Sequence, residues 1–189
     1  AHFQRVVEQH GFAIVRQTDD LAPADRRMYA TRDVTATVEH LGLITASIVS
    51  KKLAAGLQNL VLDVKCGNGA VMQDAEEARR LAESMVAVGN GAGMKTSALL
   101  TDMSVPLAWS AGNALEVLES VETLRGSGPA DLEELVCIQG GILLQSTGVC
   151  ESIDEGAFRI HDSLVDGSAM ALFEQMCVAQ GVEQSLFEN

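Results

Sequence analysis

The chain has 189 residues, of which 47% are hydrophobic and only 4% aromatic, so its core must be built mainly from Ala, Val, Leu, Ile and Met. This composition is typical of an α/β domain and excludes an intrinsically disordered chain. Asp and Glu outnumber Lys and Arg by 26 to 13, and the resulting net charge of −13 argues against a nucleic-acid-binding surface.

The N-terminal segment is predicted to contain a helix followed by a strand. Phe3, Val6 and Val7 have helical spacing, and Gly11 is a typical stop signal. The sequence FAIV, residues 12–15, then predicts a short buried strand.

An all-helical segment is expected between residues 23 and 55. Asp20 or Pro23 can begin a helix that runs through RRMYATRD. The apolar stretch 38–53 predicts a second helix, for which Gly56 is a suitable C-cap. Because this segment stands between predicted strands, we interpret it as a helical subdomain.

Strands and helices alternate from residue 58 onward. NLVLDV and KTSALLTDM are predicted strands, and DAEEARRLAESMVAV between them is a predicted helix with an acidic first turn. Three further helices are predicted in NALEVLESVETL, DLEELVCIQGGILLQST and DGSAMALFEQMCVAQG. This order predicts an α/β fold, with a mixed or parallel sheet flanked by helices and a helical subdomain inserted in the first third.

Two glycine-rich stretches are weak candidates for phosphate binding. KCGNGA, residues 65–70, follows a predicted strand, where α/β proteins bind ligands. It matches neither GxGxxG in its strand–turn–helix context nor GxxxxGK[ST]. GNGAG, residues 89–93, follows a predicted helix and is more typical of a helix C-terminus.

Cysteines and histidines predict no metal site. The four cysteines lack CxxC spacing, so we expect reduced thiols, and none of the four histidines has a ligand partner at i+4. The sequence has no uncharged apolar run of about 18 residues, so no membrane span is predicted. The chain opens on AHFQRV, without initiator Met or signal peptide, as expected for a piece of a longer protein.

A polar stripe in the second predicted helix is the first candidate site. Ile44, Ser47 and Lys51 share one helical face and offer an apolar wall, a hydroxyl and a cation. The alternative is a tolerated Ser beside a Lys that complements the dipole at the helix C-terminus. Spacing alone leaves both interpretations open.

Arg32, in YATRDVTATV, adds a second cation. Two cations and a hydroxyl match a pyrimidine ring, which presents O2 and O4 as acceptors and N3–H as a donor. Fixed positive charge also stabilises the negative charge of a departing pyrimidine when a glycosidic bond breaks. A surface ion pair with Asp33 or Glu39 is the alternative for Arg32, and it too stays open.

A resemblance to the pyrimidine-nucleoside phosphorylases is carried by LAPADRRMYATRDVTATVEHLGLITASIVSKKLAAGLQNLVLDVKCGNGA. It continues through MKTSALLTDMSVPLAWSAGNALEV to DGSAMALFEQMCVAQG, and GGILLQSTG and CVAQGVEQSL most resemble animal members. The resemblance implies the central part of a two-domain phosphorylase. Residues 23–55 would belong to its helical domain, and residues 1–22 and 56–189 to its α/β domain.

The resemblance also implies a base pocket. Arg32 and Lys51 would hold the base and stabilise its anion as catalytic residues, and Ser47 would pair with the ring edge. The other implied lining residues are Tyr29, Val38, Ile44 and Val71. No organic cofactor is implied, but a structural monovalent or calcium cation is, at Leu107, Ser110 and Glu119.

The reaction implied by the resemblance is reversible phosphorolysis of thymidine and deoxyuridine to the free base and 2-deoxyribose 1-phosphate, with phosphate as co-substrate. The family's phosphate-binding residues match positions before Ala1. We therefore expect this chain to supply the base-binding half of the site and to be inactive alone. The resemblance further implies a cytoplasmic homodimer with no nucleic-acid or membrane partner.

Two alternatives to this function stay open. The protein can be a phosphorylase that also accepts uridine, since this half of the site does not distinguish ribose from deoxyribose. It can instead be a non-catalytic chain that dimerises or binds a partner, an interpretation that the absent phosphate half favours.

Overall fold

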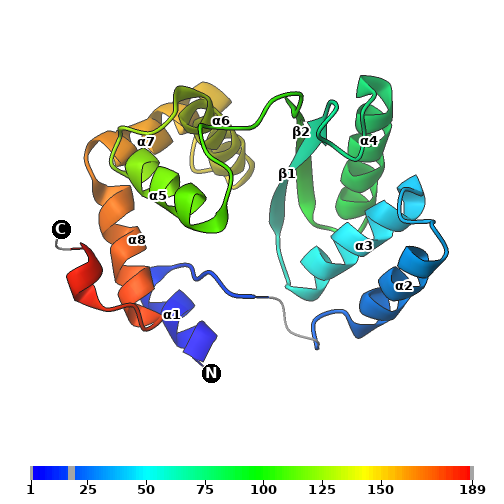
Figure 1. The fold of residues 1–189 in the computed structure, drawn as a ribbon, viewed down its shortest axis with the longest axis horizontal. Coiled ribbons are helices and arrows are strands. Elements are labelled where there is room, and N and C mark those ends of the chain that lie inside the picture. Colours follow the sequence, from blue (N-terminus) through cyan, green and yellow to red (C-terminus); the bar gives the residue numbers. More distant parts are fainter. Residues whose placement is uncertain (1, 17–19, 188–189) are drawn as a thin grey trace.

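The computed structural model describes residues 2–16 and 20–187 (Figure 1). Its elements, in chain order, are α1 (His2–His10), α2 (Pro23–Val34), α3 (Leu41–Ala54), β1 (Asn59–Cys66), α4 (Ala75–Gly91), β2 (Lys95–Asp102), α5 (Asn113–Leu124), α6 (Ala130–Ser146), α7 (Ile153–Val165), α8 (Ser168–Ala179) and the 3-10 helix η1 (Gln184–Phe187).

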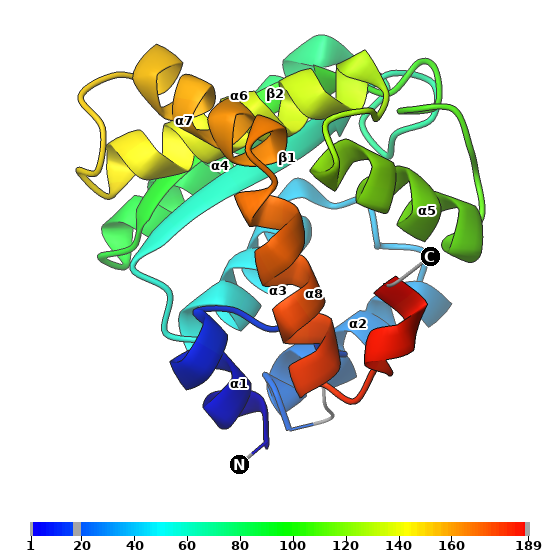
Figure 2. The same ribbon diagram turned by 90° about the vertical axis from the view of Figure 1, so that its left-hand side faces the viewer.

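The two strands form a parallel sheet. They pair without a bulge from Asn59 opposite Lys95 to Cys66 opposite Asp102. Helix α4 makes the crossover between them, and α4 and α6 lie on opposite faces of the sheet (Figures 1 and 2). Helices on both faces are what a parallel sheet requires, because neither face can be left to water. The predicted α/β class is confirmed.

The main core lies between β1, α4 and α3. Leu60, Leu62 and Val64 alternate along β1 and are buried on the face that meets α4. Val49 of α3 belongs to the same core cluster, and the hydroxyls of Thr45 and Ser84 hydrogen-bond at 3.0 Å between α3 and α4. This packing fixes α3 beside the sheet.

Local signals explain the ends of α4. The Asp74 carboxylate accepts hydrogen bonds from the backbone N–H groups of Glu76 and Glu77, so it caps the first turn. At the other end the chain turns through Gly93, whose φ is +84°, and enters β2. Residues 89–93 thus form the helix end that their glycines predict.

A second group of helices contains α5 to α8, and α1 packs against α8 (Figures 1 and 2). Helices α6 and α7 approach closely because glycines meet at their crossing. A Cβ added at Gly141 would lie 2.5 Å from the carbonyl oxygen of Ile153, and one at Gly156 would lie 2.8 Å from Cα of Gly141. The sequence reading missed α7 entirely.

The expected strand at residues 12–15 is wrong. These residues lie outside the sheet, and Ile14 is 65% exposed. Their hydrogen-bond partner is a side chain: Ile14 N–H donates to Oε1 of Gln180 at 3.0 Å, and Nε2 of Gln180 donates to the Ile14 carbonyl at 2.7 Å. The side-chain amide of Gln180 therefore makes the two backbone hydrogen bonds of Ile14 that a neighbouring strand would make in a sheet.

The helical segment between residues 23 and 55 is confirmed, with one break. Helix α2 begins at Pro23 rather than at Asp20, and α3 begins at Leu41 rather than at residue 38. Turn and irregular residues separate the two helices, and Ala36 adopts a left-handed φ of +52°. The proposed domain boundaries at residues 22 and 55 stay a prediction.

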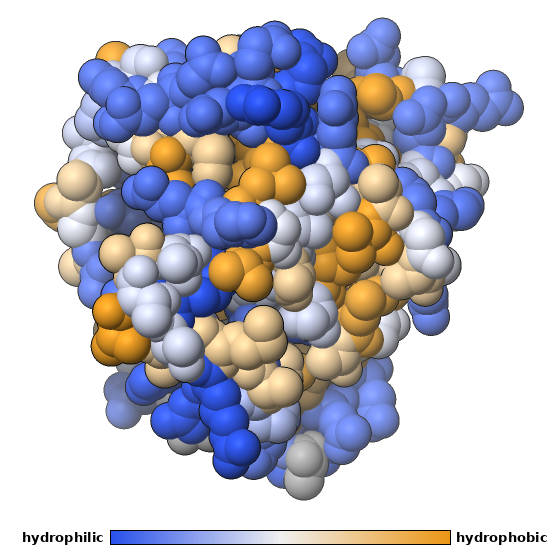
Figure 3. Space-filling view, turned by 90° about the vertical axis from the view of Figure 1, so that its right-hand side faces the viewer, coloured by the Kyte–Doolittle hydropathy of each residue, from blue (hydrophilic) through white to orange (hydrophobic). Residues whose placement is uncertain are grey.

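The face formed by α2, α3 and α4 is mixed in character. Figure 3 shows a hydrophilic band along its top and apolar side chains reaching the surface in its middle.

All four cysteines have free thiols, as expected. Over the described residues, no helix combines the length and hydropathy needed to cross a membrane.

Candidate functional site

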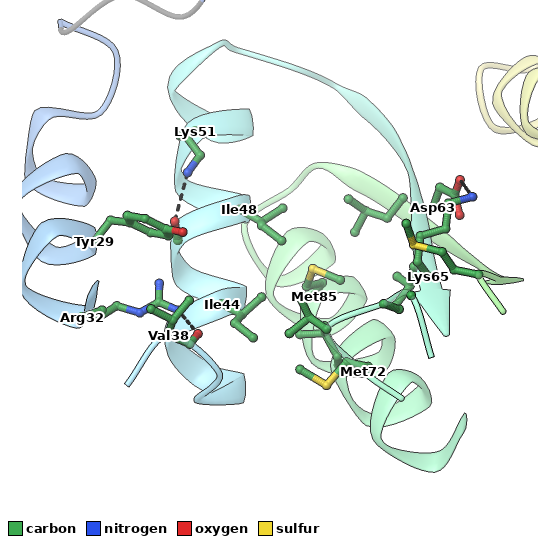
Figure 4. Close-up of a pocket in the computed structure, with 18 residues that line it drawn as sticks. Tyr29, Arg32, Val38, Ile44, Ile48, Lys51, Asp63, Lys65, Met72 and Met85 are labelled. Atoms are coloured by element: carbon green, nitrogen blue, oxygen red, sulfur yellow. Dashed lines mark hydrogen bonds and ion pairs between the residues drawn. The ribbon is translucent and has the colours of Figure 1, made fainter. Parts of the chain in front are cut away.

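A cavity of about 520 Å³ lies between the α2–α3 pair and the wall made by β1, the loop after β1 and α4 (Figure 4). Its lining includes every residue that the family resemblance implies as a base contact. These residues are Tyr29, Arg32, Val38, Ile44, Ser47, Lys51 and Val71. The structure thus brings them together from two helices and two loops, while their roles toward a ligand stay a prediction.

Helices α2 and α3 run antiparallel, and this direction sets which residues meet. Asp25, in the first turn of α2, contacts Lys51 near the end of α3. Arg32, near the end of α2, contacts the carbonyl of Leu43 near the start of α3. Polar groups therefore occur along the whole helical side of the cavity.

Lys51 is held by two partners. Its Nζ donates to Oδ2 of Asp25 at 2.8 Å and to Oγ of Ser47 at 3.0 Å. The Lys51 side chain is 27% exposed and that of Asp25 is 11% exposed, so the ion pair is largely shielded from water. Since an ammonium group has three N–H donors, one remains for a ligand.

The electrostatics of this corner favour an ionised Asp25. Burial acts to raise the pKa of the Asp25 carboxyl. Side-chain hydrogen bonds with Lys51 and Ser47, together with the positive charges of Lys51 and Arg32, outweigh burial and hold the pKa below its ordinary value.

Arg32 is nearly inaccessible, at 5% exposure. Its Nη1 donates to the Leu43 carbonyl at 3.1 Å, its Nη2 donates to the Val38 carbonyl, and its guanidinium carbon lies 5.5 Å from the centre of the Tyr29 ring. Its Nε is buried without a hydrogen-bond partner. A buried unpaired donor carries a desolvation cost, which the described residues around Arg32 leave uncompensated.

The opposite wall carries its own charged pair (Figure 4). Lys65 Nζ lies 2.7 Å from Oδ2 of Asp63 on β1. Asp63 also accepts hydrogen bonds from the hydroxyl of Thr101 on β2 and the amide of Gln139 on α6. Between the two polar ends the lining is apolar, and Figure 4 shows Ile48, Met72 and Met85 there.

The glycine-rich loop after β1 is bound to the end of β2. Gly69 N–H donates to the Met103 carbonyl at 3.0 Å, Gly67 N–H donates to the Met72 carbonyl at 3.3 Å, and Ala70 N–H donates to the Gly67 carbonyl at 3.0 Å. These three amides have partners within the protein and are not available to phosphate. These contacts give the glycine-rich residues, which were a weak candidate for phosphate binding, a structural role instead.

The residues of the implied cation site lie near one another. Oε1 of Glu119 accepts the N–H of Trp109 at 2.9 Å, and Trp109 stands in the loop between Leu107 and Ser110. Asp131 holds the same loop through the N–H of Ala108. No cluster of three His, Cys, Asp or Glu side chains suited to a metal occurs in the part of the chain that the structure describes. A cation held by Glu119 and backbone carbonyls stays a prediction.

The sequence reading missed Asp25. Asp25, Tyr29 and Arg32 have i, i+4 and i+7 spacing, so the helical face was visible in the sequence. Its partner Lys51 is 26 residues away, and only the antiparallel packing of α2 and α3 brings the two together. Lys52, by contrast, is exposed and does not line the cavity.

Comparisons with known proteins identify the family of the chain. A family described as "Glycosyl transferase family, a/b domain" matches residues 1–170. The chain is 49% identical to a thymidine phosphorylase of Agrobacterium fabrum and 52% identical to one of Mesorhizobium japonicum, in each case over 100% of this chain. It is 43% identical to a pyrimidine-nucleoside phosphorylase of Geobacillus stearothermophilus over 99% of its length. The chain spans 43% of the length of each of these relatives.

Proposed function

Because this chain belongs to the glycosyl transferase family, we propose that it carries the base-binding part of a site for reversible phosphorolysis of pyrimidine nucleosides. The observation that supports this most is the placement of Arg32, Ser47 and Lys51 along one side of a cavity whose middle is apolar. The names of the relatives, thymidine phosphorylase and pyrimidine-nucleoside phosphorylase, support the same substrate class.

The proposed reaction develops negative charge on the base. As the bond between the pentose C1′ and the ring N1 breaks, its electron pair passes to the ring, while a phosphate oxygen bonds to C1′. Hydrogen phosphate carries the proton that the free base gains, so charge and atoms balance. The ammonium of Lys51 and the guanidinium of Arg32 stabilise the departing base because its carbonyl oxygens become more negative in the transition state.

The apolar part of the cavity supports this role. Ile44 of α3, Val38 before it and Val71 after β1 provide surfaces for the faces of a planar ring. An apolar lining also lowers the local dielectric, which strengthens the interaction between the cations and the base. Ring contact and charge stabilisation are therefore supplied by the same cavity.

Phosphate, the co-substrate, needs contacts that these residues do not provide. The amides of Gly67, Gly69 and Ala70 already have partners within the protein. We infer that the phosphate contacts come from the part of the full protein that lies outside residues 1–189, which agrees with the 43% span of the relatives. The family resemblance further supports a cytoplasmic homodimer and a structural cation at Leu107, Ser110 and Glu119.

Thymidine and deoxyuridine are the proposed substrates, with uridine as the alternative. Uridine stays the alternative because one relative is named for pyrimidine nucleosides in general. The test uses the full chain, by which we mean the full-length protein that contains residues 1–189. It is incubated with thymidine or uridine, with and without inorganic phosphate, and the free base is measured by chromatography. Phosphate-dependent release of thymine is expected. A folded full chain that releases no base would contradict the proposal and favour a non-catalytic protein.

A further inference from the structure

Two cavities meet at the carboxyl end of the sheet. Beside the cavity described above, a second one of about 420 Å³ lies along the loop after β1 and the loop after β2. Lys65, Gly69 and Met103 line both cavities. Ligands of open α/β sheets bind outside the carboxyl ends of the strands, so a ligand in the first cavity can extend past these shared residues.

The first cavity changes character from one wall to the other. Its helical wall carries Arg32, Ser47 and Lys51, and its middle is apolar. Its far wall carries Asp63 and Lys65 (Figure 4). A pyrimidine nucleoside has the same order of groups, namely a polar base edge, the flat faces of the ring, and a pentose with hydroxyl groups.

The chemistry of the base sets the direction of the pentose. The ring atom N1, which carries the pentose, lies across the ring from the edge formed by N3 and C4. When that edge faces Arg32, Ser47 and Lys51, as the proposed function requires, the pentose points away from the helical wall. The polar groups that stand on the other side of the cavity are those of Asp63 and Lys65.

The ammonium group of Lys65 is fixed in place. Its Nζ lies 2.7 Å from Oδ2 of Asp63, and the two side chains are 31% and 24% exposed. The Asp63 carboxylate is anchored in turn by the hydroxyl of Thr101 and, at 3.0 Å, by the side-chain amide of Gln139. Since an ammonium group has three N–H donors, the ion pair with one carboxylate leaves donors for a ligand.

We propose that Lys65, held by Asp63, is a substrate-binding residue that recognises the pentose by donating a hydrogen bond to one of its hydroxyl oxygens. The proposal rests on the proposed function. Lys65 and Asp63 together carry no net charge, which suits an uncharged hydroxyl better than a phosphate dianion. Asp102 adds a carboxylate to the adjoining cavity and further disfavours an anion there.

Lys65→Met tests the proposal because it keeps much of the length of the side chain but removes its donors. In the full chain, the KM for thymidine at saturating phosphate should rise about tenfold, the scale of losing a hydrogen bond from a charged group. Thymine has no pentose, so its dissociation constant, measured by calorimetry, should stay nearly unchanged. That measurement also shows that the variant is folded.

Nucleosides that lack one hydroxyl identify the contact. The KM values of 3′-deoxythymidine and 5′-deoxythymidine are compared between Lys65→Met and the unmodified full chain. For one of the two analogues the substitution should cause no further rise in KM, because the hydroxyl that Lys65 contacts is already missing. A rise with both analogues as large as that with thymidine would overturn the proposal.

Lys65→Arg and Lys95→Met are the matched variants. Lys65→Arg keeps a cationic donor, so it should raise the KM for thymidine less than Lys65→Met does. Lys95 stands at the other end of the sheet, where its Nζ donates to the Ser146 carbonyl at 3.3 Å, and it lines neither of these two cavities. Lys95→Met should leave both the KM for thymidine and the affinity for thymine unchanged.

The other outcomes separate this proposal from the proposed function. A higher KM for phosphate with an unchanged KM for thymidine would replace the pentose contact by an anion contact. Equal weakening of thymine and thymidine would show that Lys65 shapes the cavity rather than contacts the pentose. Either result overturns the role of Lys65 while thymidine turnover still supports phosphorolysis. Failure of the unmodified full chain to release thymine would overturn the proposed function, and the role of Lys65 with it.

Discussion

Nζ of Lys51 lies 2.8 Å from Oδ2 of Asp25, although 26 residues separate the two in the sequence. This ion pair joins the start of α2 to the end of α3 and so sets the register of the two helices. The same antiparallel register brings Arg32 to the carbonyl of Leu43. The cations of the candidate site are therefore positioned by one helix pair before any ligand arrives.

Lys51→Ala should lower kcat/KM for thymidine by about 10²-fold or more, the scale of losing one charge contact that strengthens in the transition state. Steady-state phosphorolysis by the full chain measures this. Lys52→Ala is the control, because Lys52 is the exposed neighbour outside the cavity and its loss should leave kcat/KM nearly unchanged. Near-normal kinetics for Lys51→Ala would remove Lys51 from the mechanism.

Ser47→Ala should weaken thymine binding by about 1 kcal/mol or more, since a buried hydrogen bond to the ring edge is lost. Calorimetric titration of thymine into the full chain measures the change. Ser50→Ala serves as the comparison, because the Ser50 hydroxyl bonds to the Ser47 carbonyl within α3 and does not line the cavity. Equal affinities for the two variants would count against a ligand contact by Ser47.

Acid should remove the stabilisation that Asp25 provides. Its folded-state pKa is lowered from the ordinary value of 3.8, so the ionised form is favoured by folding. The contribution is fully present well above pH 3.8, diminishes as the pH falls below 3.8 toward the lowered pKa, and is absent once both states are protonated.

Urea unfolding of the full chain and of Asp25→Asn at several pH values measures this titration. The difference in unfolding free energy between the two proteins should decrease as the pH falls through that window. A difference that stays constant over the window would show that Asp25 has the same pKa in the folded and unfolded states.

Gly141→Ala should destabilise the protein by about 1–3 kcal/mol, the usual cost of overpacking a close contact. The added methyl group would meet the backbone of Ile153 and Ala157 on α7, which cannot move aside as a flexible side chain can. The midpoint of urea unfolding measures the loss.

Gly91→Ala provides the comparison for that substitution, because a Cβ at Gly91 meets nothing within 4 Å. It should be neutral or raise stability by up to about 1 kcal/mol, since Ala is the better helix former. Equal destabilisation by the two substitutions would show that the α6–α7 contact is not the cause.

Much of the fold could be predicted because its signals are local. The apolar run of β1 and the acidic first turn of α4 identify these elements without knowledge of their partners. Helix α7 was missed although Ser152 and Glu155 have the spacing of a capping box, and Ser152 does accept the N–H of Glu155. The mixed polar and apolar composition of α7 made this capping box easy to overlook.

The remaining differences depend on contacts between distant residues. Residues 12–15 have the composition of a strand, but Gln180 of the segment after α8 takes up the backbone groups of Ile14. Asp25 was likewise overlooked because its partner belongs to another helix. Periodicity identifies the face on which a residue lies, whereas the group that it meets is set by tertiary packing.

The glycine loop after β1 limits which substitutions can reshape this cavity. A side chain at Gly69 would place its Cβ 2.6 Å from the Met103 carbonyl, and one at Gly67 would lie 2.6 Å from Oγ of Ser104. Mutations there would displace the end of β2 before they reshaped the pocket. Positions with space around them can change the cavity at lower structural cost, and Val71 is one of them, since it is 69% exposed and borders the same cavity.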